Sequence, residues 1–412
     1  MLAADAGFVR TALVDVVLGD DAVVAMALHA VGERAAWADL VRLATHWRLV
    51  PQLREALARD DAAKARIDVP VLEFLRRQSI VHAAESAAIV RHAAEAQRLL
   101  SEAGVRTVAI KGVAAIATLY GGSSRRMVAD VDLVIEEAQL TTTRTALERS
   151  GYRDMSPPFE HHMASIGFSR HLHNYARTFA GDGGELDVHW QFGPRPPRAL
   201  AAGRIVERSI LATVEGRTLR VAGPVEFALL GVHHALRSSF AAHSTAKDLA
   251  DLRAWWEREG EGRGAELLAA AAGAGLGSSL LALARAIARR NAAHPIARGA
   301  DALDALLPAA QRREAERLEA FVERNLRGES PDDATVELFA PVVFLRSLAG
   351  PLLNRGRLRG PAPATEVLAP PKPLFVRVRN RIERGVRIGR ELLQPQRVAT
   401  YRAVARAQSR FH

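Results

Sequence analysis

The chain has 412 residues, of which 49% are hydrophobic and 25% charged, a composition typical of a globular protein with two or three domains. It contains no cysteine, which excludes disulfides, thiolate metal sites and thiol nucleophiles. The sequence has no run of about 18 uncharged apolar residues, and its N-terminus lacks the basic start and apolar run of a secretory signal. These features predict a cytoplasmic protein without a membrane span.

The net charge of +10 is concentrated at the C-terminal end of the chain. Residues 355–412 contain 14 Lys or Arg and three Glu, so the rest of the chain is close to neutral. A basic tail of this kind predicts contact with nucleic acid, an anionic membrane surface or an acidic partner. The alternative is a solvated amphipathic helix that contributes only to solubility.

Apolar residues recur at helical spacing through residues 1–103, which predicts an N-terminal helical region that stops at Gly104. Residues 104–222 alternate between short β-branched runs and helical segments, which predicts an α/β core. Helices are expected at 111–120 and 136–151. Strands are expected at 105–110, 128–135, 163–170, 173–180 and 185–192.

Residues 223–349 return to helical periodicity and predict a C-terminal helical domain. Residues 350–412 combine a Pro-, Gly- and Arg-rich linker with the basic tail, in which a last helix is expected at about 374–393. The predicted fold class is therefore α+β: a core with a short mixed sheet, flanked by N-terminal and C-terminal helical regions.

A pair of acids, Asp130 and Asp132, lies in an apolar strand with one residue between them. Because side chains alternate along a strand, both carboxylates face the same side of the sheet. Two carboxylates at this spacing repel each other, and a divalent cation between them removes the repulsion. Oxygen ligands of this type suit Mg²⁺.

A second acidic strand carries Glu185, Asp187 and His189 on one face. If this strand pairs beside the first, a third carboxylate joins the cluster, and three carboxylates can hold two metal ions. Asp187 is the preferred ligand over Glu185 because it lies in the middle of the strand. His189 is expected to contact phosphate or an acceptor, or to pack behind the metal ligands.

Upstream of these strands, Lys111-Gly112 joins a strand directly to a helix. A glycine lets phosphate approach the backbone, and a helix N-terminus offers free N–H groups and a favourable dipole. Lys111 adds a positive charge for a β- or γ-phosphate, and Arg126 is placed to reach the same anion. The order of turn, Arg, paired Asp and later acid predicts a site for a metal ion and a nucleotide.

The same stretch resembles the bacterial uncharacterised nucleotidyltransferase family of the polymerase-β-like superfamily. In that family, a Leu-Lys-Gly turn, a Tyr at the helix end, an Arg and an Asp-x-Asp-Leu strand recur in this order, followed by an acidic-x-His-Trp strand. Their counterparts here are Lys111-Gly112 (after Ile110), Tyr120, Arg126, Asp130–Leu133 and Asp187–Trp190.

The resemblance covers roughly residues 35–260 and implies a polymerase-β-like core that transfers a nucleotidyl group from an NTP such as ATP. It implies two Mg²⁺, or Mn²⁺ in their place, and carries the metal-binding and catalytic roles to Asp130, Asp132 and Asp187. The wider superfamily has Gly-Ser at the phosphate turn, where this chain has Lys-Gly.

Among the other polar residues, Lys247 lies in an expected helix near the nucleotide and is a candidate phosphate contact. The alternative is a surface pair between Lys247 and Asp251, four residues later. His161, His162, His171 and His173, together with His189, suggest either a zinc site or the lining of an acceptor pocket.

The predicted function is therefore Mg²⁺-dependent transfer of NMP from an NTP donor to a hydroxyl or phosphate of an unknown acceptor. The acceptor is a small molecule, a protein or an RNA. The main alternative is a catalytically silent nucleotide-binding or scaffold protein of a biosynthetic or toxin–antitoxin operon. A third interpretation is a helical nucleic-acid-binding protein that acts through its basic tail.

Overall fold

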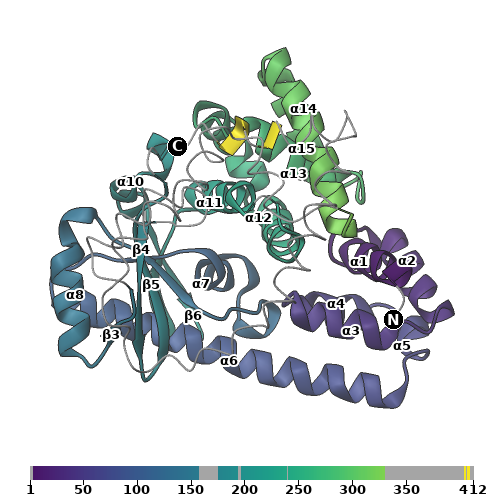
Figure 1. Ribbon diagram of the computed structural model, residues 1–412, viewed down its shortest axis with the longest axis horizontal. Helices are drawn as coiled ribbons and strands as arrows, with labels where there is room; N and C mark the ends of the chain where they lie inside the picture. The colour runs from purple at the N-terminus through teal and green to yellow at the C-terminus, as the bar shows by residue number, and fades with distance from the viewer. Residues whose placement is uncertain are drawn as a thin grey trace, which may run out of the picture.

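The computed structural model describes residues 3–156, 175–193, 196–238, 240–329, 403–404 and 406–408 (Figure 1). Within them, one mixed sheet lies between helices from the N-terminal and C-terminal parts of the chain. The predicted α+β class is confirmed. The expected strand at 163–170 and the expected helix at 374–393 lie outside the described residues.

The N-terminal part is helical, as its periodicity predicts. Its helices are α1 (Ala3–Leu18), α2 (Asp21–Glu33), α3 (Trp37–His46), α4 (Val50–Ala58), α5 (Asp61–Lys64) and α6 (Val69–Glu102). Helix α2 starts where the Asp20 side chain accepts a hydrogen bond from the Val23 N–H at 2.9 Å. Helix α6 ends just before Gly104, whose φ of +76° is the left-handed conformation expected of a glycine after a helix.

The long helix α6 packs against the sheet as well as against other N-terminal helices. The Gln97 side chain donates to the Arg220 carbonyl at 2.7 Å, and its amide oxygen accepts from the Arg220 N–H at 2.9 Å. The hydroxyl of Ser86, also on α6, accepts from the Val128 N–H at 3.2 Å. The second half of α6 is therefore a layer of the α/β core, although its sequence reads as part of the N-terminal helical region.

The sheet has seven strands in the order β3-β4-β5-β2-β1-β7-β6. The strands are β1 (Val108–Ala109), β2 (Val131–Val134), β3 (Arg153–Asp154), β4 (Tyr175–Gly181), β5 (Gly184–Gln191), β6 (Ile210–Val214) and β7 (Arg217–Val221). The prediction of a short sheet was wrong in strand number. Strands β1 and β2 fall within expected strands and β4 and β5 extend one residue beyond theirs, whereas β3, β6 and β7 were not predicted.

The hairpin of β6 and β7 shows why its strands escaped prediction. Its turn consists of Glu215 and Gly216, both with positive φ (51° and 73°), as a two-residue hairpin turn requires. The Glu-Gly pair between two alternating runs is a weaker signal than Asn-Gly, and much of β6 is exposed. β7 is nevertheless central, because it pairs with β1 in parallel and extends the sheet.

Several of the connections outside the hairpins contain short helical elements. They are α7 (Lys111–Ala115), the π-helix η1 (Ile116–Tyr120), η2 (Ser123–Arg125), η3 (Glu137–Gln139), α8 (Leu140–Arg149), η4 (Arg198–Leu200) and α10 (Ala202–Glu207). The expected helix over 111–120 therefore exists, but its second half is wound as a π-helix that ends at left-handed Gly121. A π-turn of this kind is often found at functional sites.

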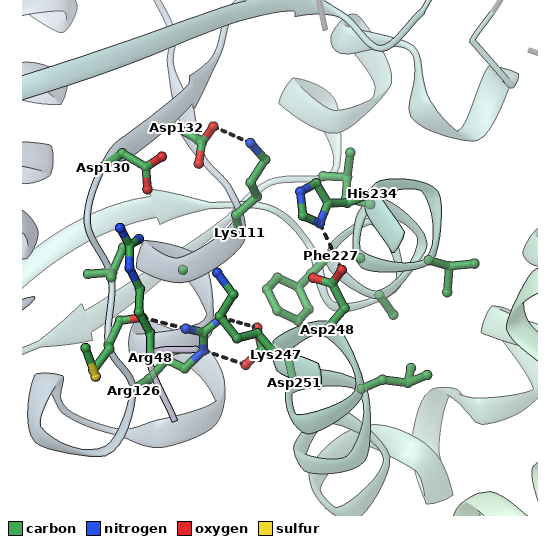
Figure 2. A pocket seen from close by; sticks show the side chains of 18 of the residues that line it. Arg48, Lys111, Arg126, Asp130, Asp132, Phe227, His234, Lys247, Asp248 and Asp251 are labelled. Carbon is green, nitrogen blue, oxygen red and sulfur yellow. Dashed lines mark hydrogen bonds and ion pairs between the residues drawn. The ribbon is translucent and has the colours of Figure 1, made fainter. Parts of the chain in front are cut away.

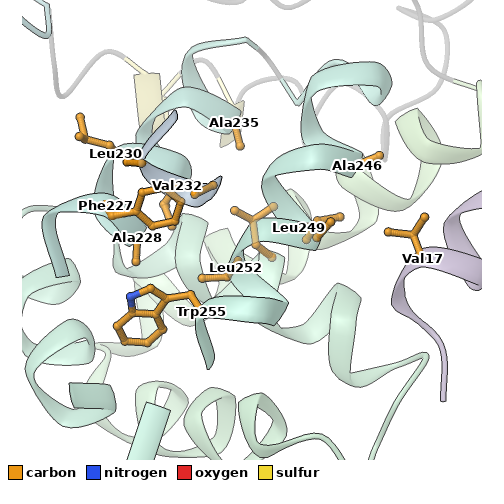
Figure 3. Packing of buried hydrophobic residues seen from close by; sticks show 14 of the residues in the cluster. Val17, Phe227, Ala228, Leu230, Val232, Ala235, Ala246, Leu249, Leu252 and Trp255 are labelled. Carbon is orange, nitrogen blue, oxygen red and sulfur yellow. The ribbon is translucent and has the colours of Figure 1, made fainter. Parts of the chain in front are cut away.

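In Figure 1, the C-terminal helices lie above and to the right of the sheet. They are α11 (Pro224–Arg237), α12 (Ala242–Gly273), α13 (Gly277–Ala288), α14 (Pro295–Leu306) and α15 (Ala309–Arg327). Figure 3 shows Phe227 and Leu230 of α11 near Leu252 and Trp255 of α12. Trp255 is fully buried and donates to the Pro224 carbonyl at 2.7 Å. This packing fixes α12 against α11, and it is α12 that supplies one wall of the site.

The end of the basic tail returns to this layer. Ala403, Val404 and Ala407 are buried, and the Gln408 side chain donates to the Leu236 carbonyl of α11 at 2.9 Å. Within the described residues, no helix is both long and apolar enough to cross a membrane.

Candidate active site

The acidic cluster is built by two parallel neighbouring strands. β2 carries Asp132, with Asp130 just before its first residue, and β5 runs beside it in parallel. Their register places Asp187 next to Asp132 and His189 next to Val134. The strand pairing on which the predicted cluster depended is confirmed. Glu185, the other acid considered, is exposed near the start of β5 and is not part of the cluster.

Asp132 is buried and holds two partners. Lys111 Nζ lies 2.5 Å from its Oδ1, and His189 Nε2 lies 2.8 Å from the same oxygen. Burial opposes ionisation of this carboxyl, but the positive charge of Lys111 and the hydrogen bond from His189 outweigh it and hold the pKa well below its usual value. Asp132 is therefore a carboxylate at every pH of biological interest.

The cluster fits a divalent metal ion. One ligand atom each of Asp132, Asp187 and His189 lies within 4.8 Å of the others, so that one ion can contact all three. The Thr178 hydroxyl donates to Asp187 Oδ1 at 2.6 Å and orients that carboxylate. Carboxylate oxygens suit Mg²⁺ or Mn²⁺.

His189 combines packing with its contact to Asp132. The ring is buried, stacks on Phe192 at a centroid distance of 5.6 Å, and its Nδ1 has no partner within the described residues. Burial lowers the pKa of His189, although the hydrogen bond to Asp132 opposes this. A neutral ring that donates from Nε2 to Asp132 is consistent with both observations. The other histidines considered for zinc, His161, His162, His171 and His173, lie outside the described residues.

Asp130 lies outside the tight metal-binding group and lines an open pocket instead. Displacement of water by the surrounding protein and repulsion from Asp132 raise the pKa of Asp130, while Lys111 acts in the opposite direction. Asp130 is thus exposed at the pocket, whereas Asp132, which also lines it, is buried.

The Lys111-Gly112 turn has a conformation that few residues adopt. Lys111 has a φ of +51°, in the left-handed region, which costs a side-chain-bearing residue about 1–3 kcal/mol. This conformation aims its ammonium group at Asp132. A Cβ on Gly112 would lie 2.7 Å from Val128 Cγ2, so glycine is required here for the approach of Val128. Both residues line the pocket.

The pocket lies between the sheet and the C-terminal helices and is open to solvent (Figure 2). Asp130, Asp132 and the Lys111 turn form one wall, and α11 and α12 form the opposite wall. Lys247 lines it from α12, as the sequence suggested, and has no partner among the described residues.

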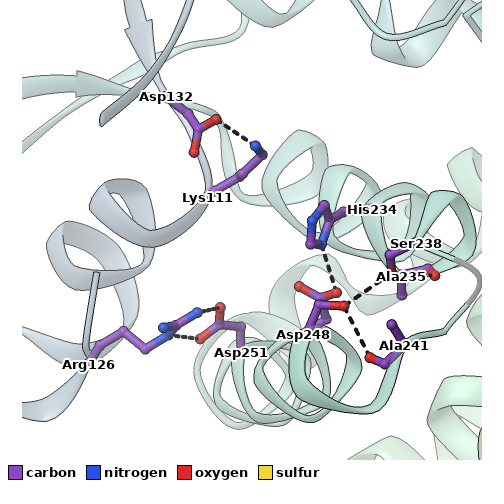
Figure 4. A network of polar contacts seen from close by, with 10 residues as sticks. Lys111, Arg126, Asp132, His234, Ala235, Ser238, Ala241, Asp248 and Asp251 are labelled. Carbon is purple, nitrogen blue, oxygen red and sulfur yellow. Dashed lines mark hydrogen bonds and ion pairs between the residues drawn. The ribbon is translucent and has the colours of Figure 1, made fainter. Parts of the chain in front are cut away.

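A histidine and an acid contact each other on the wall formed by α11 and α12. His234 Nδ1, on α11, lies 2.9 Å from Asp248 Oδ2, on α12. Figure 4 shows the His234 ring between Asp248 and Lys111. The Asp248 carboxylate is therefore already engaged.

Arg126 has a different partner from the one suggested by the sequence. Its Nε and Nη2 lie 2.8 Å from the two carboxylate oxygens of Asp251, and both side chains are largely buried (Figure 4). The Tyr120 hydroxyl, at the end of η1, donates to Asp251 Oδ1 at 2.9 Å. Asp251 therefore does not form the surface pair with Lys247; it ties the loop before β2 to α12.

Sequence reasoning missed Arg48, which lines the pocket from the N-terminal helices. It follows the end of α3, and its φ of +59° is again left-handed. A residue of this type after a helix reads as an ordinary loop position, and no local signal shows that it faces a distant strand.

Comparison with known proteins identifies a family for the part of the chain that contains this site. The profile of the family described as "Uncharacterised nucleotidyltransferase" matches residues 33–291. No curated protein sequence matches the chain significantly. Among solved structures, the chain is similar to a solution structure of the antibiotic-resistance factor ANT(2'')-Ia, with 15% identity and a TM-score of 0.32, over 45% of this chain and 90% of that one.

Proposed function

Because the chain belongs to the family of uncharacterised nucleotidyltransferases, we propose that it is a Mg²⁺-dependent enzyme that transfers NMP from an NTP to an acceptor. The acceptor group is a hydroxyl or a phosphate. The observation that carries the proposal is the register of β2 and β5, which sets Asp187 beside Asp132. This acidic pair adjoins a lysine turn at the wall of an open pocket.

The carboxylates of Asp130, Asp132 and Asp187 would hold the metal ions, with Mn²⁺ as a substitute. When bound, these ions supply charge neutralisation for the leaving pyrophosphate and lower the pKa of the attacking hydroxyl. Asp132 is ionised before any ion binds, because Lys111 and His189 stabilise its charge. Asp187, which accepts a hydrogen bond from Thr178, would also help to activate the acceptor.

Lys111 and Gly112 on one wall of the pocket, and Lys247 on the opposite wall, would receive the triphosphate. Lys111 Nζ contacts Asp132 in the ligand-free protein, and its flexible stem lets the ammonium group turn towards a phosphate. Arg126 would act through Asp251, by holding α12 and therefore Lys247 at the pocket.

The test is to incubate the protein and Mg²⁺ with α-³²P-labelled NTPs and fractions of a cell extract, and to find which component becomes labelled. The Asp132→Asn variant is the control, and its labelling should fall at least about 100-fold because the site loses a charge at its centre. Labelling that Asp132→Asn leaves unchanged would contradict the proposal. Binding of NTP without labelling or pyrophosphate release in any fraction would favour the nucleotide-binding scaffold.

A further inference from the structure

The charges that line the pocket are not all paired. On the helical side, Asp248 contacts His234, and Asp251 contacts Arg126 and Tyr120. Two cations that line the same pocket, Arg48 and Lys247, have neither a hydrogen bond nor an ion pair among the described residues. The described lining of the pocket therefore includes two cations that no described acid pairs with.

The two cations are close enough to affect each other. Burial and the charges of Arg126 and Arg48 lower the pKa of Lys247, although Asp248 and Asp251 oppose them. The positive charge of Arg48 also acts on Asp130, and Figure 2 shows Arg48 on the side of the pocket towards Asp130. Placing two cations together away from bulk water costs free energy, which a bound anion would offset.

The backbone conformation of Arg48 is a separate indication that its side chain serves a ligand. The Leu49 N–H donates to the Ala44 carbonyl at 2.7 Å and the Arg48 N–H donates to the Thr45 carbonyl at 3.1 Å, which is the Schellman ending of a helix. Arg48 occupies the left-handed position where glycine is usual, at a cost of about 1–3 kcal/mol. A long cationic side chain at this position, turned into a pocket, is explained by a ligand better than by helix termination.

From these observations we infer that Arg48 and Lys247 form an anion subsite for the distal phosphates of the nucleoside triphosphate. The N-terminal helical region thus contributes a binding residue to a site otherwise built by the core and α12. The inference rests on the proposed function for the identity of the ligand. To reach this subsite, the ligand must be a polyanion that extends from the acidic cluster past Asp130.

The experiment is isothermal titration with inorganic tripolyphosphate, once with Mg²⁺ and once with EDTA, and with AMP as a ligand that lacks distal phosphates. Arg48→Gln and Lys247→Gln should each weaken tripolyphosphate binding by about tenfold or more, the usual effect of losing a charged hydrogen bond. Arg48→Lys should retain most of the affinity, and AMP binding should not change. The control is Arg42→Gln, because Arg42 is an exposed residue of α3 paired with Asp39.

Thermal unfolding supplies a second readout. Without ligand, Arg48→Gln should melt at the same temperature as the wild type or higher, because an unpaired cation is removed. Tripolyphosphate should then raise the melting temperature of the wild type more than that of the variant. A variant that melts clearly below the wild type without ligand would show that Arg48 already has a stabilising partner, and would overturn the inference.

Unchanged tripolyphosphate affinity in Arg48→Gln, or no binding by the wild type in either condition, would also overturn the inference. Arg48 would then serve only to balance the charge of Asp130. These titrations need no acceptor and no turnover. They can therefore fail while the labelling experiment succeeds, and they can succeed while no acceptor is labelled.

Discussion

The ion pair between Arg126 and Asp251 is the contact whose removal should affect the stability of the protein most clearly. Asp251→Asn keeps the size of the side chain and removes its charge. The Arg126 guanidinium would then remain in an environment where its side chain is only 8% exposed, without the carboxylate that now accepts two hydrogen bonds from it. The Tyr120 hydroxyl would keep a hydrogen-bond acceptor at position 251.

The expected loss follows from the burial of both partners. Removing one member of a buried ion pair costs about 3–5 kcal/mol, because the other charge stays desolvated. We expect the lower end, about 3 kcal/mol, since Arg126 also donates to the Met127 carbonyl. Glu148→Gln removes the i,i+4 partner of Arg144, a pair that is 51% and 43% exposed. This matched control should cost about 0.5 kcal/mol or less.

The assay is urea unfolding at neutral pH, followed by circular dichroism. The double variant Arg126→Met/Asp251→Leu should recover much of the loss, because no buried charge remains. If Asp251→Asn unfolds within about 0.5 kcal/mol of the wild type, the pair is effectively solvated and the reasoning is refuted. A double variant whose loss equals the sum of the single losses would show that the two side chains are not coupled.

Three further outcomes are expected. Lys111→Ala should weaken ATP binding by about tenfold in isothermal titration, because it removes a cation beside the triphosphate; an unchanged affinity would mean that Lys111 only balances Asp132. Gly112→Ala should lower the free energy of unfolding in urea by about 1–3 kcal/mol, since the new Cβ would lie 2.7 Å from Val128 Cγ2; a stability equal to the wild type would show that Val128 moves aside freely. Asp130→Asn should raise the free energy of unfolding in EDTA at neutral pH, because the raised pKa of Asp130 means that the folded state resists its ionisation. This gain should vanish as the pH falls below about 4, where the carboxyl is protonated in both states; a gain that does not change with pH would contradict the assigned cause.

Much of the architecture was predictable because it depends on local patterns. The period of the apolar residues identified the helices of both ends, and Gly104 correctly marked the end of α6. The alternation around Asp130 and Asp132 identified β2 as a strand. The hairpin around Gly216 was missed because its outer strand is largely exposed and lacks a strong apolar alternation.

The site was predictable where it follows from one strand or one turn. Asp132 and Asp187 could be chosen from their own strands, but only the register shows that they are neighbours. The partner of Arg126 could not be chosen, since Asp251 is 125 residues away and looks like half of a surface pair with Lys247. Arg48 gave no signal at all, because its role depends on where an N-terminal helix ends relative to the sheet.

By itself, the sequence determined the helices and four of the seven strands of the sheet, the acidic pair, and the lysine-glycine turn, because spacing along the chain sets which side chains share a face. Tertiary structure alone decided which charges are neutralised and which remain free. Asp251 engages Arg126, His234 engages Asp248, and Lys247 is left facing the pocket. The physical reason is that electrostatic pairing depends on distance in space and on burial, and neither is set by neighbouring residues in the chain.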